Sequence, residues 1–151
     1  MKNIDGKRYG NVGEAETLAA FTRLGVPTYI PWGDAETADM VADFGGGLKK
    51  IQCKSSRALS GSGGSIVFQV ARKTRNKGGE ERTGYEEGEV DYFALYNALN
   101  GEVYLVPWQG KDCRSVSLVV DTLTPRMATQ RLARDFLLEK VVRKAEGDMG
   151  G

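Results

Sequence analysis

Histidine is absent from this chain of 151 residues. Its absence excludes a serine–histidine–aspartate triad, a catalytic cysteine–histidine pair and a zinc ion bound by histidine, at least within this chain. Hydrolases that use histidine as their general base are excluded as well. Any hydrolytic chemistry must therefore depend on carboxylates, amides and lysine, together with a hard metal ion.

Cysteines and long apolar runs are scarce. Cys53 and Cys113 do not make a disulfide framework, so a reducing, cytoplasmic location is expected. No apolar run approaches the roughly 18 residues of a membrane helix, and the N-terminus lacks the apolar stretch of a signal peptide, so we expect no membrane partner. The chain length indicates a single domain over residues 1–146, followed by a disordered tail over residues 147–151.

Acidic residues are missing from one long stretch. Between Phe44 and Gly79 the chain carries eight lysines and arginines and no aspartate or glutamate, a local charge of +8 in a chain whose net charge is +1. The rest of the chain therefore carries −7, the difference between +1 and +8. This segregation indicates a polyanionic partner held on one face, with a solvated basic loop as the alternative.

The hydrophobic pattern predicts a helix, a run of strands and a second helix. This order is typical of an α/β fold with a mixed central sheet flanked by helices. Residues 55–65 are expected to form a mobile loop, and residues 72–88 are polar and expected to be irregular. Helices are expected over residues 13–24 and from Thr124 to about Lys144, and strands over residues 28–32, 39–44, 48–54, 66–71, 90–97, 102–106 and 116–120.

The hairpin predicted around the three consecutive glycines at 45–47 is the most informative segment. Strand side chains alternate with period two, so Cys53 points toward the core while Gln52 and Lys54 share the opposite face. Asp39 on the neighbouring strand can join that face. A carboxylate, an amide oxygen and a lysine in this arrangement can hold a divalent metal ion against a phosphate.

Each residue of this group has an expected role. Asp39 would bind Mg²⁺ directly, and Gln52 and Cys53 would offer an amide oxygen and a backbone carbonyl oxygen. Glu14, in the first predicted helix, would reach the metal through a water molecule, and Lys54 would orient the attacking water or stabilise charge on the phosphate. Mn²⁺ can substitute for Mg²⁺. The alternatives are a strand-end aspartate, an edge-strand lysine and a glutamate that interacts with the helix dipole.

Short motifs in a fixed order carry a resemblance to a known family. The order of Gly13-Glu14, Tyr-Ile-Pro-Trp-Gly, Asp39-Met-Val and Ile-Gln-Cys-Lys54 resembles the PD-(D/E)XK nuclease superfamily. The later pieces are similar to its intron-encoded branch, the homing endonucleases of bacterial group I introns. These pieces are Tyr85-x5-Asp91-Tyr-Phe-Ala, Val103-Tyr-Leu-Val-Pro107 and the Gln130-Arg131 helix, and the whole likeness covers roughly residues 8–140.

The resemblance implies a restriction-endonuclease-like core and a Mg²⁺-dependent, site-specific endonuclease that acts on double-stranded DNA as a homodimer or homotetramer. Two positions depart from the family pattern. Ala38 replaces a proline, and Gln52 replaces the usual glutamate or aspartate, which should weaken metal affinity because a neutral amide attracts a hard cation less than a carboxylate does. A Holliday-junction-resolving nuclease and a catalytically inactive DNA-binding module of the same fold remain alternatives.

Basic residues are the natural candidates for contacts with DNA. A lysine or arginine on a phosphate provides affinity without sequence information, and contacts with base edges provide specificity. The strand over residues 66–71 and the basic segment after it could enter the major groove as a β-ribbon. The candidates for DNA contacts are Ser55, Arg57, Arg72, Lys73, Arg75 and Lys77.

Overall fold

A five-stranded mixed sheet forms the centre of the computed structural model, which describes residues 6–33, 36–61, 64–120 and 130–149. The strand order is β1-β2-β3-β7-β8, with β3 and β7 parallel and the other neighbours antiparallel. The predicted mixed α/β sheet is therefore confirmed. The strands are β1 (Thr28–Tyr29), β2 (Met40–Phe44), β3 (Gly47–Ser56), β7 (Tyr92–Asn97) and β8 (Val103–Pro107).

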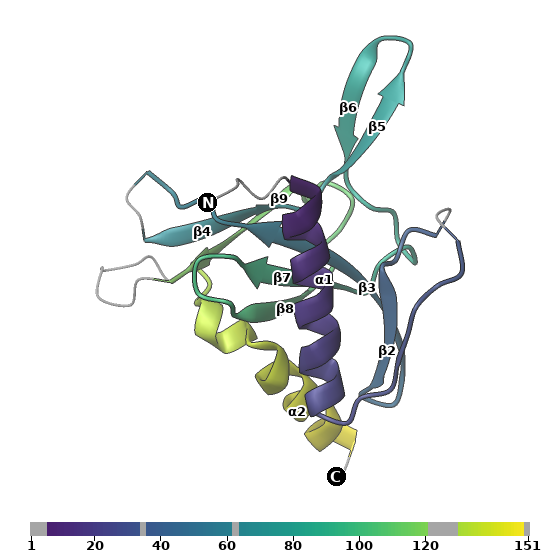
Figure 1. Cartoon of the computed structure of the whole chain (residues 1–151), viewed down its shortest axis with the longest axis vertical. Helices are drawn as coiled ribbons and strands as arrows, with labels where there is room; N and C mark the ends of the chain where they lie inside the picture. Colours follow the sequence, from purple (N-terminus) through teal and green to yellow (C-terminus); the bar gives the residue numbers. More distant parts are fainter. Residues whose placement is uncertain (1–5, 34–35, 62–63, 121–129, 150–151) are drawn as a thin grey trace.

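Two helices cover one face of this sheet. Helix α1 (Gly6–Arg23) crosses the sheet and α2 (Leu138–Met149) packs beside it, as Figure 1 shows. Between helices and sheet lies a core in which Phe21 of α1, Ile51 of β3 and Val142 of α2 are almost fully buried. No helix in the described parts of the chain is long and apolar enough to cross a membrane.

A small second sheet covers the other face. It pairs β4 (Ser65–Gln69) with β9 (Ser115–Val119) in antiparallel fashion, and the short 3₁₀ helix η1 (Ala133–Phe136) lies at its side. Along β7, Phe93 belongs to the core beneath this small sheet, whereas Ala94 belongs to the core beneath the helices. The central strands thus bury side chains on both faces, as alternation requires of a covered sheet.

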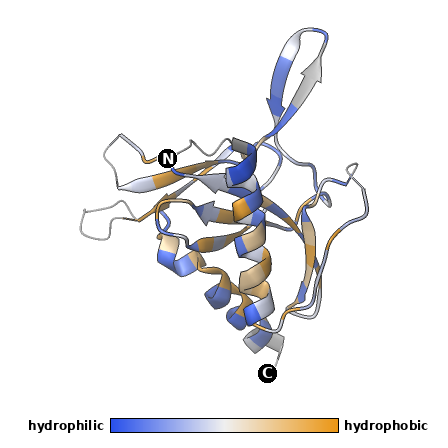
Figure 2. Cartoon of the chain, viewed as in Figure 1, coloured by the Kyte–Doolittle hydropathy of each residue, from blue (hydrophilic) through white to orange (hydrophobic). Residues whose placement is uncertain are grey.

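A third sheet, the two-stranded hairpin β5–β6, projects from the body of the molecule in Figure 1. It consists of β5 (Arg72–Asn76) and β6 (Gly79–Thr83). The sequence predicts irregular structure here, and that prediction is wrong. Its second strand is exposed along almost its whole length, and the hairpin has no hydrophobic residues in Figure 2. The sequence here therefore has no apolar alternation from which to recognise a strand.

The two predicted helices differ from the observed ones. Helix α1 begins at Gly6, seven residues before the predicted start at Gly13. The predicted C-terminal helix is wrong over residues 130–137, the described residues that precede α2. There Leu132 and Leu137 make β-bridges to the sheets, so the backbone does not form an α-helix. Residues 121–129 lie outside the described residues. Helix α2 continues to Met149, through the first three residues of the tail that the sequence predicts to be disordered.

Gly13 sets how closely α1 approaches the sheet. A Cβ atom at this position would overlap the hydroxyl of Ser55 on β3 and lie 3.2 Å from the Cβ of Tyr96 on β7. The glycine is therefore required by close packing in the middle of the helix, and it does not begin the helix. Gly10, one turn earlier, has open space around the corresponding position.

We predict that Gly13→Ala lowers the free energy of unfolding by roughly 1–3 kcal/mol, the usual cost of overpacking, despite the better helix propensity of alanine. Gly10→Ala is the matched control and should stabilise the protein by roughly 0.5–1 kcal/mol. Urea unfolding followed by circular dichroism measures both. Equal stability of the two variants would show that Gly13 does not limit the approach of helix to sheet.

Candidate active site

Asp39 lies immediately before β2 and is bonded to β3. Its backbone N–H donates to the carbonyl of Ile51 at 2.9 Å, and its carboxylate Oδ2 accepts the N–H of Cys53 at 2.8 Å. The register pairs Met40 with Ile51, and one step further along both chains this places Asp39 opposite Gln52. The carboxylate is thus attached to the strand that carries the other candidate residues.

Gln52 and Lys54 lie on the same face of β3, as predicted from alternation. In the β3–β7 register Gln52 lies beside Phe93, whose side chain faces the core under the small sheet. The ammonium of Lys54 lies 5.9 Å from the centroid of the Tyr85 ring. Burial lowers the pKa of Lys54, and the nearby Asp39 carboxylate opposes this effect.

Glu14 of α1 meets Asp39 across the edge of the sheet. Burial raises the pKa of Glu14 to about 7, and a hydrogen bond with the Asp39 carboxyl group and repulsion from its charge add to the effect. Two carboxyl groups this close do not both ionise readily without a cation. The pair therefore fits a site for a positively charged ligand.

The amide of Gln52 supports the same interpretation. Its Oε1 atom is buried and has no hydrogen-bond partner. A buried unpaired acceptor is costly and rare, so it calls for a ligand. Among the described residues no three histidine, cysteine, aspartate or glutamate side chains are grouped to hold a metal. The oxygens at this place belong to the carboxyl groups of Asp39 and Glu14 and to the Gln52 amide, and oxygen is the ligand type that hard cations prefer.

Cys53 contributes no thiolate to this site. Its side chain packs against the core beneath the helices, together with residues such as Ala94. Burial raises the pKa of the Cys53 thiol, and the charge of Asp39 raises it further. The thiol stays protonated at neutral pH, so only the backbone carbonyl of Cys53 is suited to bind a hard cation.

Four of the candidate DNA contacts come from the β5–β6 hairpin. Arg72 and Lys73 lie at its base, Arg75 lies within β5, and Lys77 is exposed in the turn. Glu80 of β6 lies opposite Arg75 in the register, and its carboxylate lies 3.9 Å from the ammonium of Lys73. The hairpin is therefore less one-sidedly basic than the acid-free stretch suggests, because its second strand begins where the acidic residues resume.

The other two candidates lie against α1. Ser55 points to the helix side of β3, and its hydroxyl donates to the carbonyl of Tyr9 at 3.2 Å. Arg57 donates from Nη1 to the Tyr9 hydroxyl at 2.8 Å and lies 4.8 Å from the centroid of its ring. Ser55 therefore does not share the face of Gln52 and Lys54, and its described contact is structural.

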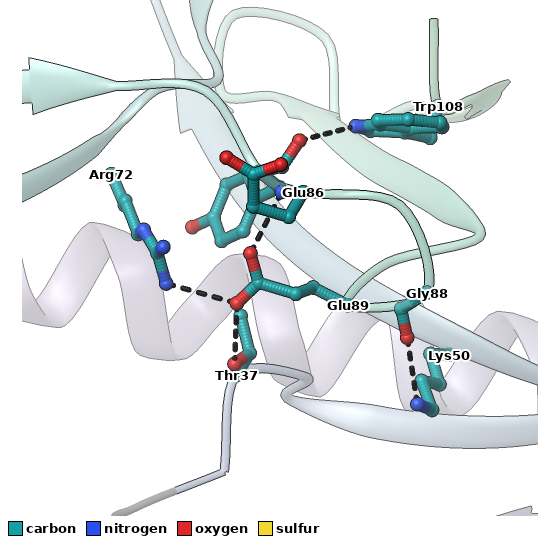
Figure 3. A network of polar contacts seen from close by, with 8 residues as sticks. Thr37, Lys50, Arg72, Glu86, Gly88, Glu89 and Trp108 are labelled. Carbon is teal, nitrogen blue, oxygen red and sulfur yellow. Dashed lines mark hydrogen bonds and ion pairs between the residues drawn. The ribbon is translucent and has the colours of Figure 1, made fainter. Parts of the chain in front are cut away.

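Glu89 is a residue that the sequence did not single out. Figure 3 shows its carboxylate at the centre of a polar network, with contacts to Arg72, Thr37 and the backbone of Glu86. Glu89 lies in a polar segment without hydrophobic periodicity, so the sequence contains no pattern that would identify it as a functional residue. Asp91, by contrast, has a structural contact, because its Oδ2 accepts the backbone N–H of Lys50 at 2.8 Å.

Comparisons with known proteins identify the family and the fold of this chain. A family model described as PD-(D/E)XK endonuclease matches residues 4–137. Among solved structures, the chain is similar to a bacterial homing endonuclease, I-Ssp6803I, with a TM-score of 0.75 and 20% sequence identity. The likeness covers 97% of this chain and 99% of that chain and shows a shared fold. No curated protein matches the sequence.

The raised pKa of Glu14 predicts a pH-dependent stability of the metal-free protein. The pKa of this carboxyl group is 4.5 in the unfolded chain and about 7 in the folded protein. The group therefore contributes to the free energy of unfolding below pH 4.5, and this contribution is lost as the pH rises through 7. Glu14→Gln removes the loss, so at pH 8 the variant should be more stable than the wild type by on the order of 1 kcal/mol.

Thermal unfolding of the metal-free protein between pH 4 and pH 8 measures this difference. Glu16→Gln on the same helix is the control and should shift stability by the same amount at every pH. A Glu14→Gln profile parallel to that of the wild type would contradict the prediction.

Proposed function

This chain belongs to the PD-(D/E)XK endonuclease family, and from that premise we propose that it is a metal-dependent, site-specific endonuclease that hydrolyses phosphodiester bonds in double-stranded DNA. The observation that carries the proposal is the contact between the carboxyl groups of Glu14 and Asp39. Asp39 also lies opposite Gln52, whose amide oxygen has no partner, and its charge acts on the ammonium of Lys54. Its structural neighbour is a bacterial homing endonuclease, and we extend that role to this chain.

The proposed chemistry divides among four side chains. Asp39 and the Oε1 atom of Gln52 would hold a divalent ion, Mg²⁺ or Mn²⁺, which when bound supplies charge neutralisation at the phosphate and an acidified water. Glu14 would reach the ion through a water molecule held at its carboxylate. Lys54 would donate from Nζ to a phosphate oxygen or to the attacking water.

DNA would be held chiefly by the projecting hairpin. A two-stranded ribbon fits the major groove of B-form DNA, and Lys73, Arg75 and Lys77 would contact phosphates. The base of the hairpin lies close to the active site, since the charge of Lys73 lowers the pKa of Lys54. Arg57 would add a phosphate contact from the side of α1.

We also propose that the enzyme works as a homodimer or homotetramer. Cutting both strands of a duplex requires two active sites, which two-fold symmetry provides. Large apolar side chains at one edge of the sheet support such an assembly, because apolar surface of this kind is typical of protein contacts. They are Tyr29, Ile30, Trp32 and Leu48, exposed by 56%, 64%, 97% and 63%.

A catalytically inactive DNA-binding module is the second candidate, and one observation favours it. The neutral Gln52 leaves the site with one carboxylate fewer than the family pattern, which reduces the attraction for Mg²⁺.

A junction-resolving nuclease shares the same active site and differs in its substrate. Preferential cutting of a four-way junction over linear duplex would identify it.

We predict that Asp39→Ala and Lys54→Ala each lower the single-turnover cleavage rate by roughly 100- to 1,000-fold, because each removes a group that acts on the reacting phosphate. The substrate comes from a cleavage selection on a randomised duplex library in Mg²⁺. Lys49→Ala removes a lysine from the same strand and should change the rate only a few-fold. Wild-type rates in the two active-site variants would refute the assignment.

We predict that Gln52→Glu strengthens Mg²⁺ binding by roughly tenfold, because a carboxylate replaces a neutral amide at a hard cation. Isothermal titration calorimetry of the DNA-free protein measures the affinity. Asp39→Asn should lose most of the binding and serves as the opposite control. Absence of binding to the wild type at millimolar Mg²⁺, with intact salt-sensitive DNA binding, would favour the inactive module.

A further inference from the structure

The guanidinium of Arg72 occupies an unusual position at the base of the hairpin. Its Cζ lies 5.7 Å from the centroid of the Tyr85 ring, and its Nη1 donates to Oε2 of Glu89 at 2.9 Å. Its Nε is buried and has no hydrogen-bond partner. A buried charged donor without a partner is rare, so the Nε side of the fork is suited to an acceptor that arrives with a ligand.

Tyr85 connects this arginine with the active site. Its ring is 4% exposed and packs against Phe93, with the centroids 5.8 Å apart. The same ring lies within 6 Å of the Lys54 ammonium and the Arg72 guanidinium. The charge of Asp39 contributes to raising the pKa of the Tyr85 hydroxyl, after burial, so the phenol lies within electrostatic reach of the metal-binding carboxylate. Arg72 therefore borders the same site as Lys54.

Glu89 holds Arg72 in place. Its Oε1 accepts the backbone N–H of Glu86 at 2.7 Å, and its Oε2 accepts from Arg72 and from the Thr37 hydroxyl at 3.2 Å (Figure 3). The N–H of Glu86 is the main cause of a lowered pKa of Glu89, so the carboxylate stays ionised at neutral pH.

The loop that carries Glu89 is anchored as well. Lys50 Nζ donates to the carbonyl of Gly88 at 2.7 Å, and Trp108 Nε1 donates to the carbonyl of Tyr85 at 3.0 Å. Figure 3 shows the Lys50–Gly88 contact and the contact of Trp108 in the surroundings of the Glu89 network. The carboxylate is therefore presented from a fixed backbone.

A carboxylate at this place is unfavourable for binding DNA. It stands beside a cation in a region that the proposed function brings to the phosphate backbone, where negative charge weakens binding. The Arg72 and Glu89 side chains are 38% and 23% exposed, and ion pairs of that exposure contribute little to stability. The presence of Glu89 is therefore better explained by a role in orienting Arg72 than by a contribution to the stability of the fold.

We propose that Arg72 contacts the phosphate at the scissile bond through the Nε side of its guanidinium, and that Glu89 is the positioning residue that orients it. The inference rests on the proposed function and extends it to residues outside the motif. Thr37 lies two residues before Asp39, so Glu89 joins the base of the hairpin to the segment that carries the metal-binding carboxylate.

The test compares two variants that remove the same charge from one loop. The amide in Glu89→Gln has a single acceptor oxygen. It cannot accept hydrogen bonds both from the Glu86 N–H and from Arg72 and Thr37. We expect its single-turnover cleavage rate at saturating enzyme to fall by about 10- to 100-fold, while its affinity for duplex DNA stays equal or rises. Glu86→Gln, exposed on the same loop, should leave the rate unchanged. A wild-type rate in Glu89→Gln, or an affinity that falls with the rate, would overturn the proposal.

Two further variants separate positioning from a general structural role. In an Arg72→Ala background, Glu89→Gln should cause no further loss of rate, because the residue it orients is gone. Thr37→Val removes one partner of Glu89 without changing charge and should slow cleavage several-fold at unchanged affinity. Losses that multiply in the double variant, or a normal rate in Thr37→Val, would count against positioning.

DNA binding in Ca²⁺ makes the test independent of cutting. Arg72→Ala should reduce the salt dependence of binding to a mixed-sequence duplex by about one phosphate contact, and this reduction should shrink when Glu89 is already Gln. If the wild type cuts no DNA in Mg²⁺ while Arg72→Ala still reduces the salt dependence of binding, the proposed function is wrong, and the contact between Arg72 and a phosphate is supported. An unchanged salt dependence overturns the contact whether or not the protein cuts.

Discussion

The hydrogen bond from the Cys53 N–H to the Asp39 carboxylate is the contact on which the candidate site depends. It fixes a charged oxygen to β3, directly beside the strand residues Gln52 and Lys54. Charge-assisted bonds of this kind are stronger than neutral ones and hold their geometry. The repulsion that Asp39 exerts on Glu14 follows from that fixed position. Holding the two carboxyl groups close together has an electrostatic cost, which a bound cation would offset under the proposed function.

The packing of the sheet explains why this arrangement is possible. β3 buries Ile51 beneath the helices, and the opposite side of the same strand carries polar groups next to the ring of Tyr85. Close approach of α1 at Gly13 brings Glu14, the next residue, up to the edge of the sheet. Gly13 therefore determines how close α1 lies to the sheet, and with it the position of the Glu14 carboxylate.

The short-range part of the site could be predicted from the sequence. Alternation along one strand is a local property, so the shared face of Gln52 and Lys54 followed from the residue order. The β5–β6 hairpin could not be predicted in this way, because its strands are polar and lack apolar alternation. The end of the chain was misjudged for a related reason. Leu132 and Phe136 have helical spacing, as do Leu137 and Val141. However, Leu132 and Leu137 make β-bridges to strands elsewhere in the chain.

By itself, the sequence determined the family and the mixed α/β fold, and it predicted the hairpin on which Gln52 and Lys54 share a face, since these depend on residue types and on their spacing along the chain. Only the tertiary structure decided that Glu89, Thr37 and Arg72 form one network and that Tyr85 lies beside Lys54. Those contacts join segments that are far apart in the sequence, with several strands between them. Their formation depends on how whole elements pack, and no local pattern records that packing.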